Sequence, residues 1–447
     1  MVRFQLHNFG CRTNQAEGSA LRQQLLAAGL AEVPRFEPSQ VAILNTCTVT
    51  ATADAEVRQV IRRIHRANPL CRILVTGCYS QRAAQEIATL PGVAWVVGNS
   101  HKHKVAELVK EQFGLAADLT PQAGDVASAR VDVLVGELAA GFEFSPVPLC
   151  GNDRTRPTLK VQDGCNARCS FCIVPQVRGR SRSLAADKAV AQIGELAARG
   201  YQEVVLSGIN LGSYGQDLRP RLALPALLER ILAETPIVRL RVSSLEVTDL
   251  SAEILRLFAR EPRLAQHFHV PLQSGSDRIL RLMRRPYSAA QYAERLFGIH
   301  ELMPNCGLGA DVMAGFPSET EEDHAASLRC IESLPFTYLH IFPYSARPGT
   351  PAATEPAQVN GRVIRERCQQ LRSLMKAKRQ VFLAVQVGRQ LSVLTLDDTE
   401  DGARLALSSN YLKVALRGPD PGANRLLNAR IERVAGDLVW GAPEEPM

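Results

Sequence analysis

Short β-branched segments that alternate with helical patterns, beginning near Leu159, constrain the fold of this chain more than any other feature. In the first helical pattern, LAADKAVAQIGELAARG, we predict that Ser183 caps the helix and that Gly200 ends it. Repeated strand–helix units build parallel sheets that close on themselves, so the pattern predicts an α/β partial (βα)6 barrel over residues 151–382. The candidate strands are TLKVQ, EVVLSG, IVRLRVSS, HFHV, LGADVMAGF and YLHIFPY.

The catalytic groups of such a barrel lie at the carboxyl ends of its strands. We therefore expect the site among the residues that end the predicted strands or follow them directly. These residues are Cys165, Ser207, Gly208, Ser243, Ser244, Gln273 and Gly315.

The first hundred residues repeat the alternation on a smaller scale. RFQLHNFG, VAILNTC, RILVTGC and AWVVG are candidate strands, separated by helical stretches near 15–28, 52–67 and 80–88, which predicts a doubly wound parallel sheet over residues 1–114. Cys11, Cys47 and Cys78 each follow a different strand of this sheet. A single cysteine there is often just a small buried hydrophobe. Three after successive strands predict a cysteine cluster at the ligand-binding edge of the sheet.

The remaining segments have weaker patterns. Residues 115–150 are expected to be a linker with a partial strand at VDVLV. A basic helix is predicted over GRVIRERCQQLRSLMKAKRQ, and the all-β pattern that follows predicts a small antiparallel β-barrel over residues 383–447. We expect HKHK at 101–104 to be a solvated helix start, and Cys71, Cys150, Cys306, Cys330 and Cys368 to be core or surface thiols.

Three cysteines lie within eight residues in KVQDGCNARCSFCIVP, at Cys165, Cys169 and Cys172. A disulfide framework is disfavoured by the odd total of 11 cysteines in 447 residues and by the lack of a signal peptide or a long apolar span, which together predict a cytoplasmic protein. Zinc needs four ligands, and the next histidine is the distant His267. A cubane iron–sulfur cluster held by three thiolates keeps one iron open for a small molecule.

The spacing C-x3-C-x2-C, with Phe171 before the last cysteine, resembles the signature of the radical S-adenosylmethionine (SAM) superfamily. Across nearly the whole chain, the sequence resembles the radical SAM methylthiotransferases, which add a TRAM domain at the C-terminal end. The motifs are most similar to the branch that acts on N6-threonylcarbamoyladenosine at position 37 of tRNA. They are GCRTNQAE, NTCTVT, VPQVRGRSRS, PLQSGSDRILRLMRR, GFPSETEED and FPYSARPGT.

The resemblance implies two 4Fe-4S clusters and their chemistry. Cys165, Cys169 and Cys172 would hold the cluster that cleaves SAM to a 5′-deoxyadenosyl radical. Cys11, Cys47 and Cys78 would hold an auxiliary cluster that carries the sulfur to be inserted. The radical would remove a hydrogen from an unactivated C–H bond, and a second SAM would supply the methyl group. An external electron donor such as flavodoxin or ferredoxin is implied as well.

The resemblance also assigns SAM contacts by position in the motifs. Ser207 and Gly208 would receive the SAM amino group, and Phe171 would lie near the adenine. Ser243, Ser244 and Gln273 would approach the ribose and the methionine portion. The serines could instead cap strand ends, and Phe171 could be ordinary core packing.

The charge of the chain is compatible with a tRNA partner. The net charge is +7 and the isoelectric point is near 8.9. Residues 383–447, however, contain seven Lys/Arg against nine Asp/Glu, so the C-terminal barrel is formally acidic. We therefore expect RNA binding to be shared among that barrel, the basic helix at 362–379 and the arginines after Cys172. The residues concerned in the barrel and after Cys172 are Arg389, Lys413, Arg417, Arg178, Arg180 and Arg182.

Two other functions are consistent with the same motifs. The same chemistry could act on isopentenylated adenosine in tRNA or on an aspartate of a ribosomal protein. A chain with iron–sulfur sites and a basic surface could also be a non-catalytic RNA-binding redox sensor, although that function leaves the full barrel unexplained.

Overall fold

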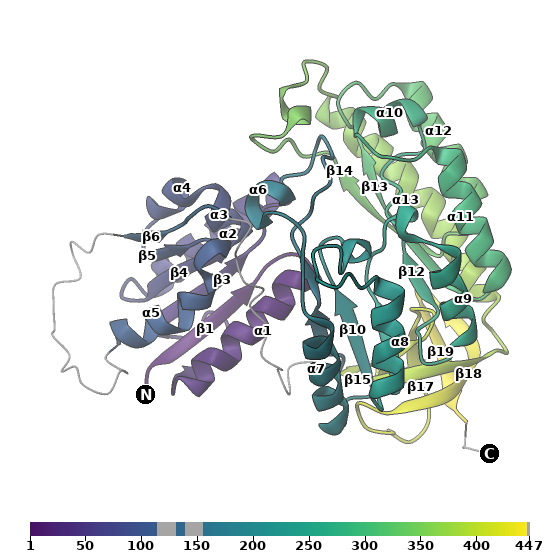
Figure 1. Ribbon diagram of the computed structural model, residues 1–447, viewed down its shortest axis with the longest axis horizontal. Coiled ribbons are helices and arrows are strands. Elements are labelled where there is room, and N and C mark those ends of the chain that lie inside the picture. The colour runs from purple at the N-terminus through teal and green to yellow at the C-terminus, as the bar shows by residue number, and fades with distance from the viewer. Residues whose placement is uncertain (114–130, 139–154, 445–447) are drawn as a thin grey trace.

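The computed structural model describes residues 1–113, 131–138 and 155–444 (Figure 1). Most of the expected linker, and Cys150 with it, lies outside the described residues. The chain forms an N-terminal sheet, a central partial barrel and a C-terminal β-barrel, as predicted. Within the described residues, no helix is both long enough and apolar enough to cross a membrane.

The N-terminal sheet is parallel throughout and has the strand order β2-β1-β3-β4-β5-β6. Its strands are β1 (Arg3–Asn8), β2 (Ala31–Glu32), β3 (Val41–Thr46), β4 (Arg72–Gly77), β5 (Val93–Val97) and β6 (Asp132–Leu134). The predicted strand in VDVLV is thus β6, and it extends this sheet by pairing with β5. Because β1 lies between β2 and β3, the direction of winding reverses at β1, where such sheets place their ligands.

Helices cover both faces of the N-terminal sheet, so its strands are buried on both sides. On one face, α1 (Arg12–Ala27) and α5 (Val105–Gln112) contribute Leu21, Leu25 and Val109 to an apolar core. On the other face, α2 (Ala51–Ala67) and α4 (Ala84–Ala88) contribute Ile61 and Ile87. This is the doubly wound arrangement that the sequence predicted.

All six strands predicted for the barrel are present. They are β7 (Thr158–Lys160), β10 (Glu203–Ser207), β11 (Arg239–Val242), β12 (His267–His269), β13 (Gly307–Ala314) and β14 (Tyr338–Pro343). They pair in parallel within the groups β7-β10-β11 and β12-β13-β14, and the bridge from Ser244 to His269 joins the two groups. The result is a partial (βα)6 barrel.

Helices pack against one face of this partial barrel. They are α7 (Ala186–Ala198), α8 (Leu224–Glu234), α9 (Ala252–Arg260), α11 (Ala289–Leu302), α12 (Glu321–Ser333) and α13 (Gly361–Ala384). Figure 1 shows α11, α12 and α13 on the side of β13 and β14 that faces away from the N-terminal sheet. The opposite face of the strands is therefore the inner face of the barrel.

The predicted cap of α7 was wrong. Its N-cap is Ala185, and Ser183 lies before the helix in β9 (Arg182–Ser183). Ser183 Oγ donates to Asp217 Oδ1 at 2.6 Å and accepts from the amide of Gly215, so a neighbouring loop uses this hydroxyl. Gly200, with φ of 89°, follows the last turn and ends the helix as predicted.

The C-terminal strands form a closed barrel in the order β15-β16-β17-β19-β18. They are β15 (Gln390–Glu400), β16 (Ala403–Ser408), β17 (Lys413–Leu416), β18 (Leu426–Ala435) and β19 (Leu438–Pro443). The pairing is antiparallel, as predicted, except between β17 and β19, which pair in parallel to close the barrel. Closure leaves no unpaired strand edge.

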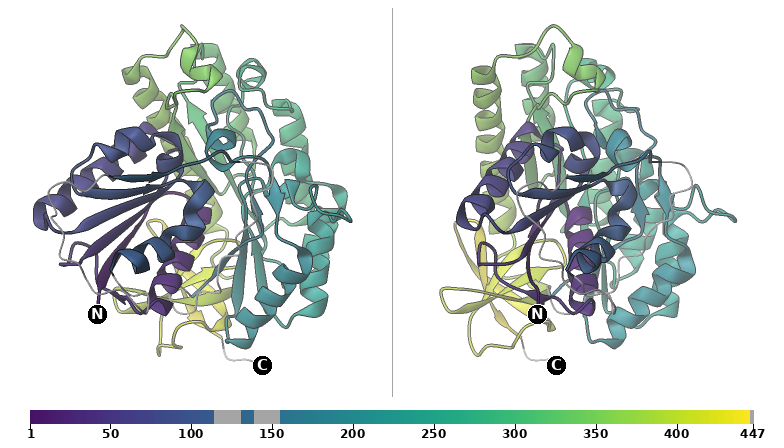
Figure 2. Two further views of the ribbon diagram at one scale, coloured as in Figure 1. Left: turned by 60° about the vertical axis from the view of Figure 1, so that its left-hand side comes forward. Right: turned by 90° about the vertical axis from the view of Figure 1, so that its left-hand side faces the viewer.

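The C-terminal barrel covers the amino ends of the central strands (Figures 1 and 2). Arg239 at the start of β11 and Arg241 two residues further along both bind the buried carboxylate of Glu203. They also donate to the backbone carbonyls of Leu407 and Ser408, each at 3.0 Å. Burial alone would raise the pKa of Glu203, but the two guanidinium groups hold it well below its usual range. The carboxyl ends of the strands are left for the cysteine loop.

Candidate active site

The cysteine loop follows β7 and the short β8 (Gln162–Asp163) and holds Cys165, Cys169 and Cys172. Burial raises the pKa of Cys172 to about 12, and the thiolates of Cys169 and Cys165 add to the rise. The pKa of Cys165 is raised for the same reasons. Three thiols that oppose one another's ionisation lie close together, and a bound cationic cluster would supply the charge that keeps them ionised.

Two polar side chains that the sequence analysis did not assign donate to these sulfurs. Arg285 Nη1 lies 3.4 Å from Cys169 Sγ, and Asn210 Nδ2 lies 3.8 Å from Cys165 Sγ. Arg285 belongs to the motif PLQSGSDRILRLMRR and Asn210 to LSGIN, so both motifs were visible. The sequence could not show these contacts, because each contact joins two segments that are far apart in the chain.

The expected SAM contacts lie at neighbouring strand ends. Ser207 and Gly208 end β10, Ser243 and Ser244 follow β11, and Gln273 follows β12. A Cβ atom at Gly208 would lie 2.8 Å from Gln162 Oε1, so a larger residue there would have to displace the buried Gln162 side chain. Gln273 has φ of 66°, a left-handed conformation that is uncommon outside glycine.

Two polar atoms in this area are buried without a partner among the described residues, Ser243 Oγ and Asn210 Oδ1. Buried polar atoms are normally hydrogen-bonded, so unpaired ones beside a cysteine loop fit a polar ligand. An ammonium group or a ribose hydroxyl, both present in SAM, would supply the missing donors. Phe171 packs edge-on against Phe316 with ring centroids 6.5 Å apart, which also accommodates the core-packing alternative.

The N-terminal cysteines come together from three separate strands. Cys11 is the N-cap of α1, Cys47 follows β3, and Cys78 opens α3 (Cys78–Arg82). Burial raises the pKa of Cys47 to about 12, and the thiolates of Cys78 and Cys11 raise it further. A Cβ atom at Gly10 would lie only 2.7 Å from Cys47 Sγ, which shows how tightly these loops approach. Cys78 Sγ accepts from Asn99 Nδ2 at 3.5 Å.

The two cysteine triads are neighbours. Cys78 packs against Ile173 and Val177, and Ile173 directly follows Cys172. The short helix α3 contacts α6 (Val174–Arg178), and Asn99 Nδ2 also donates to the carbonyl of Val177 at 2.7 Å. Only one turn of helix and one apolar layer therefore separate the N-terminal triad from the cysteine loop.

A buried set of charges lies beside the N-terminal triad and joins the sheet domain to the barrel. We call it the first ion cluster: Glu17, Lys102, Lys160, Asp163 and Arg178. Arg178, 2% exposed, donates to Glu17 Oε1 at 2.8 Å and to Asp163 Oδ1 at 3.0 Å. Burial would raise the pKa of Glu17, but Arg178, Lys102 and Lys160 hold it well below its usual range. Both carboxylates of the cluster are therefore ionised.

A second ion cluster lies next to Cys47 of the N-terminal triad. Arg347 reaches across from the barrel and donates to Asp54 and, at 2.8 Å, to Thr48 Oγ1, next to Cys47. Arg82 binds the same Asp54 carboxylate at 2.8 Å. Two buried sets of charges thus attach the domains to each other beside the triad.

For residues of the first ion cluster, one expectation was wrong and one was only partly right. Arg178 is buried among carboxylates and cannot contact RNA phosphate, whereas Arg180 is exposed. HKHK does lie at a helix start with His103 and Lys104 exposed, but Lys102 is half-buried and donates to Glu17 and Asn45. Arg178 and Lys102 bind carboxylates within the protein, because buried acidic residues from another part of the chain face them.

The cations of the C-terminal barrel that were expected to bind RNA have neighbours of their own. Lys413 lies 3.9 Å from Glu400, Arg417 lies 3.7 Å from Glu432, and Arg389 donates to Asn305. These pairs are exposed and can open for a stronger partner.

Along α13 the basic residues divide into two kinds. Arg367 is buried against Glu319 at 2.7 Å, and Lys378 donates to the carbonyl of Glu332. Arg365, Arg372 and Lys376 are exposed, and the structure records no hydrogen bond or ion pair for them among the described residues. These three residues of the helix best suit contact with RNA.

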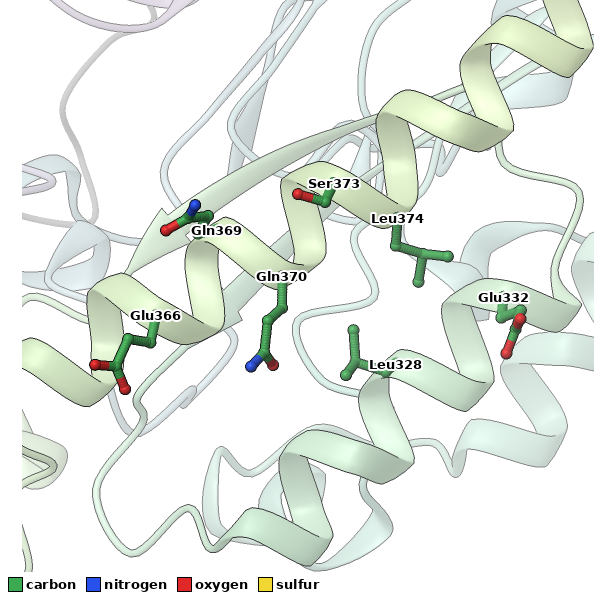
Figure 3. Close-up of a pocket in the computed structure, with 7 residues that line it drawn as sticks. All are labelled: Leu328, Glu332, Glu366, Gln369, Gln370, Ser373 and Leu374. Atoms are coloured by element: carbon green, nitrogen blue, oxygen red, sulfur yellow. The ribbon is translucent and has the colours of Figure 1, made fainter.

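Other features lie apart from the cysteines. Cys71, Cys306 and Cys368 are buried and Cys330 is half-buried, as expected of core thiols. A pocket between α12 and α13 lies on the outer side of the barrel (Figure 3) and contains no cysteine. Its lining residues are Leu328, Glu332, Glu366, Gln369, Gln370, Ser373 and Leu374.

A partial (βα)6 barrel that gathers three cysteines on the loop after its first strand, beside unpaired buried polar atoms, defines the class: a radical SAM enzyme. Comparison with known proteins agrees. Residues 159–331 match the model of the radical SAM superfamily, and residues 3–98 match a model described as uncharacterized protein family UPF0004.

Similar proteins narrow the class. A threonylcarbamoyladenosine tRNA methylthiotransferase of Bacillus subtilis is 34% identical over 96% of this chain and 94% of its own length. A tRNA-2-methylthio-N(6)-dimethylallyladenosine synthase of Syntrophobacter fumaroxidans is 36% identical over 79% of this chain and 76% of its own. A radical SAM methyltransferase structure, TsrM from Kitasatospora setae, shares the fold with a TM-score of 0.54 and 15% identity, over 79% of this chain and 77% of that one.

The chain therefore belongs to the radical SAM methylthiotransferases. Membership implies SAM and a 4Fe-4S cluster as cofactors. The unpaired Ser243 Oγ and Asn210 Oδ1 and the crowded cysteine loop fit both cofactors.

Proposed function

We propose that this enzyme converts N6-threonylcarbamoyladenosine at position 37 of tRNA into its 2-methylthio derivative. The observation that carries the proposal is the packing of Cys78 against Ile173 and Val177, directly after the cysteine loop. Sulfur insertion needs a radical source and a sulfur source within reach of one substrate atom, and two adjacent cysteine triads meet that need. The name of the Bacillus subtilis relative supports this choice of adenosine.

In the proposed mechanism, Cys165, Cys169 and Cys172 hold the first 4Fe-4S cluster, and Cys11, Cys47 and Cys78 hold a second. When bound, these groups and SAM supply the radical that removes the hydrogen at C2, the sulfur that replaces it and the methyl group. The protein positions them and excludes water. Arg285 and Asn210 donate to sulfurs of the loop, and Ile173 and Val177 form the apolar layer toward Cys78.

The remaining assignments belong to the same proposal. Ser207, Gly208, Ser243, Ser244 and Gln273 contact SAM from neighbouring strand ends, and Phe171 lies near its adenine. A flavodoxin or ferredoxin supplies electrons, and the enzyme works in the cytoplasm. The domain limits are 1–114, 151–382 and 383–447, with β6 added to the first domain.

Analysis of tRNA nucleosides by mass spectrometry tests the proposal. In a strain that lacks this gene, the 2-methylthio form of threonylcarbamoyladenosine should disappear and its precursor should accumulate. Expression of the wild-type chain should restore it. Loss of 2-methylthio-isopentenyladenosine instead would assign the enzyme to the reaction named for the Syntrophobacter relative. An unchanged nucleoside profile would contradict both.

A further inference from the structure

Three polar residues lie side by side on the inner face of the barrel, outside the cysteine sites. His269 ends β12, Asp311 lies within β13, and His340 lies within β14. Their neighbours Ala310, Val312 and Ile341 point the other way, into the core beneath the helices. Alternation along the strands therefore aims the three polar side chains into the barrel.

Hydrogen bonds arrange the three residues around one carboxylate oxygen. His269 Nε2 lies 3.1 Å from Asp311 Oδ1, and His340 Nδ1 lies 3.3 Å from the same atom. Burial would raise the pKa of Asp311, but bonds from both imidazoles hold it well below its usual range. An ionised carboxylate only accepts, so His269 and His340 each donate to it. The tautomer of His340 that donates from Nδ1 has Nε2 as an acceptor, and no described residue is recorded as sharing that atom.

Beneath these three residues, toward the amino ends of the strands, side chains fill the barrel. Tyr338 OH lies 3.0 Å from His269 Nδ1 and 2.8 Å from His267 Nε2, and the ring of His267 stacks on Tyr411 of the C-terminal barrel at 4.3 Å. Burial holds the pKa of His267 well below its usual value, so this ring is neutral. A series of hydrogen bonds therefore runs from His267 through Tyr338 and His269 to Asp311. It holds the imidazole of His340 in place from the side of the barrel nearer the amino ends of the strands.

Above these residues, toward the carboxyl ends of the strands, side chains are exposed to solvent. The His340 side chain is 55% exposed. Phe342, two residues further along the same face of β14, is 42% exposed although it is a large apolar side chain in a strand. The two rings meet edge to face at an interplanar angle of 74°, with centroids 6.3 Å apart. An exposed aromatic ring beside a fixed imidazole acceptor suits a nucleobase that carries a polar group, because bases stack on aromatic side chains.

The position fits a substrate that must reach the cysteine loop. Met313, two residues beyond Asp311 on the same face, packs against the apolar group that also receives Phe171 of the loop. Two residues of strand span roughly 7 Å. The carbonyl of Asp311 also accepts from the amide of Gln273, the proposed SAM contact, at 2.8 Å. The three polar residues thus lie one layer below the radical site.

We propose that His269, Asp311 and His340 form the subsite for the polar N6 substituent of the substrate adenosine, with Phe342 stacking on the base. The inference rests on the proposed function and deepens it. A threonylcarbamoyl group carries N–H and O–H donors that can bind His340 Nε2, whereas an isopentenyl group carries none. His340 therefore contributes to the choice between the two nucleosides, and Asp311 and His269 position it.

Binding of short RNA tests the subsite. The probes are two anticodon stem-loops, one with threonylcarbamoyladenosine and one with unmodified adenosine at position 37, and the protein is the cluster-reconstituted, SAM-bound full chain. We expect His340→Phe to reduce the preference for the modified stem-loop by about three- to tenfold, as for the loss of one hydrogen bond, without weakening binding of the unmodified one. His340→Gln, which keeps an acceptor, should retain part of the preference. His300→Gln, at an exposed position of α11, is the matched control.

An undiminished preference in His340→Phe, with production of the methylthio nucleoside by the wild type intact, would overturn the subsite and leave the proposed function standing. A wild type that neither prefers nor modifies the threonylcarbamoyl substrate would overturn both. Elemental analysis separates a third outcome, because the three ligand atoms lie within 4.8 Å of one another and could hold a cation. Zinc or iron beyond the cluster iron, absent from His340→Phe, would replace the subsite with a metal centre.

Discussion

The two cysteine triads of this enzyme are built in opposite ways. Cys165, Cys169 and Cys172 lie within eight residues of one loop, whereas Cys11, Cys47 and Cys78 come from three different strands. The loop brings its three thiols together by their spacing in the sequence, and Arg285 and Asn210 donate to two of the sulfurs. The N-terminal triad needs a folded sheet and lies beside two ion clusters that attach the sheet to the barrel. The first triad depends on local sequence, and the second depends on domain packing.

The largest expected effect is the loss of SAM cleavage when the cysteine loop is changed. Replacing Cys165, Cys169 and Cys172 together by alanine should abolish SAM cleavage, because the variant has no thiolates to hold the first cluster. Iron should fall from about eight to about four per chain if the N-terminal triad holds its own cluster. Iron analysis and 5′-deoxyadenosine production measure the two effects. Undiminished cleavage would mean that this loop does not hold the cluster.

Loss of the N-terminal triad should remove sulfur insertion and leave SAM cleavage intact. The Cys11, Cys47 and Cys78 triple alanine variant should still produce 5′-deoxyadenosine but form no methylthio nucleoside, because the loop keeps its own ligands. Chromatography of the same reaction mixture measures both products. If this variant still modifies tRNA, the triad is structural and the comparison between the two sites fails.

Arg178 tests whether domain packing supports the second triad. Arg178→Met should lower the free energy of unfolding by about 3–5 kcal/mol, because it leaves Glu17 and Asp163 buried with less compensating charge. The exposed Arg180→Met is the matched control and should change stability by about 0.5 kcal/mol or less. Urea unfolding measures both. Equal midpoints for the two variants would show that the first ion cluster adds no stability.

Lowering the pH should reduce the difference in unfolding free energy between the wild type and Arg178→Met. The pKa values of Glu17 and Asp163 are held below normal in the folded protein, so their stabilisation is complete above their unfolded pKa values, near 4, and is lost as the pH falls through the folded ones. The unfolding free energies of wild type and Arg178→Met should therefore converge below about pH 4. A constant difference across this range would mean that the effect of Arg178 is packing rather than charge.

The smallest effect concerns RNA. Changing Arg372 and Lys376 to glutamine should reduce the log–log salt slope of tRNA binding by roughly 0.7–0.9 for each phosphate that the helix no longer neutralises. SAM cleavage without tRNA should stay unchanged. Lys188→Gln with Arg256→Gln, both exposed on α7 and α9, makes the same change in charge elsewhere. Identical slopes for the two double variants would remove Arg372 and Lys376 from the RNA-binding surface.

Local pattern accounts for much of what could be predicted. The six barrel strands, the four longer strands of the first sheet and the closed C-terminal barrel follow from periodicity, because one buried face imposes its repeat on the sequence. The placement of Cys11, Cys47 and Cys78 after successive strands was predictable too, since parallel strands end at one edge. The misassigned cap at Ser183 shows the limit, because a hydroxyl before a helix was used by Asp217 instead.

The sequence by itself determined the order of the domains, the cysteine spacing and the class of chemistry, because these depend on residues close together in the chain or on repeating patterns. Only the tertiary structure decided which charges are buried. It placed Arg178 against Glu17, 161 positions away, and Arg285 beside Cys169. It also brought His269, Asp311 and His340 from three strands to one carboxylate oxygen. An isolated arginine or histidine in a sequence has no partner until folding supplies one, and burial then makes that partner obligatory.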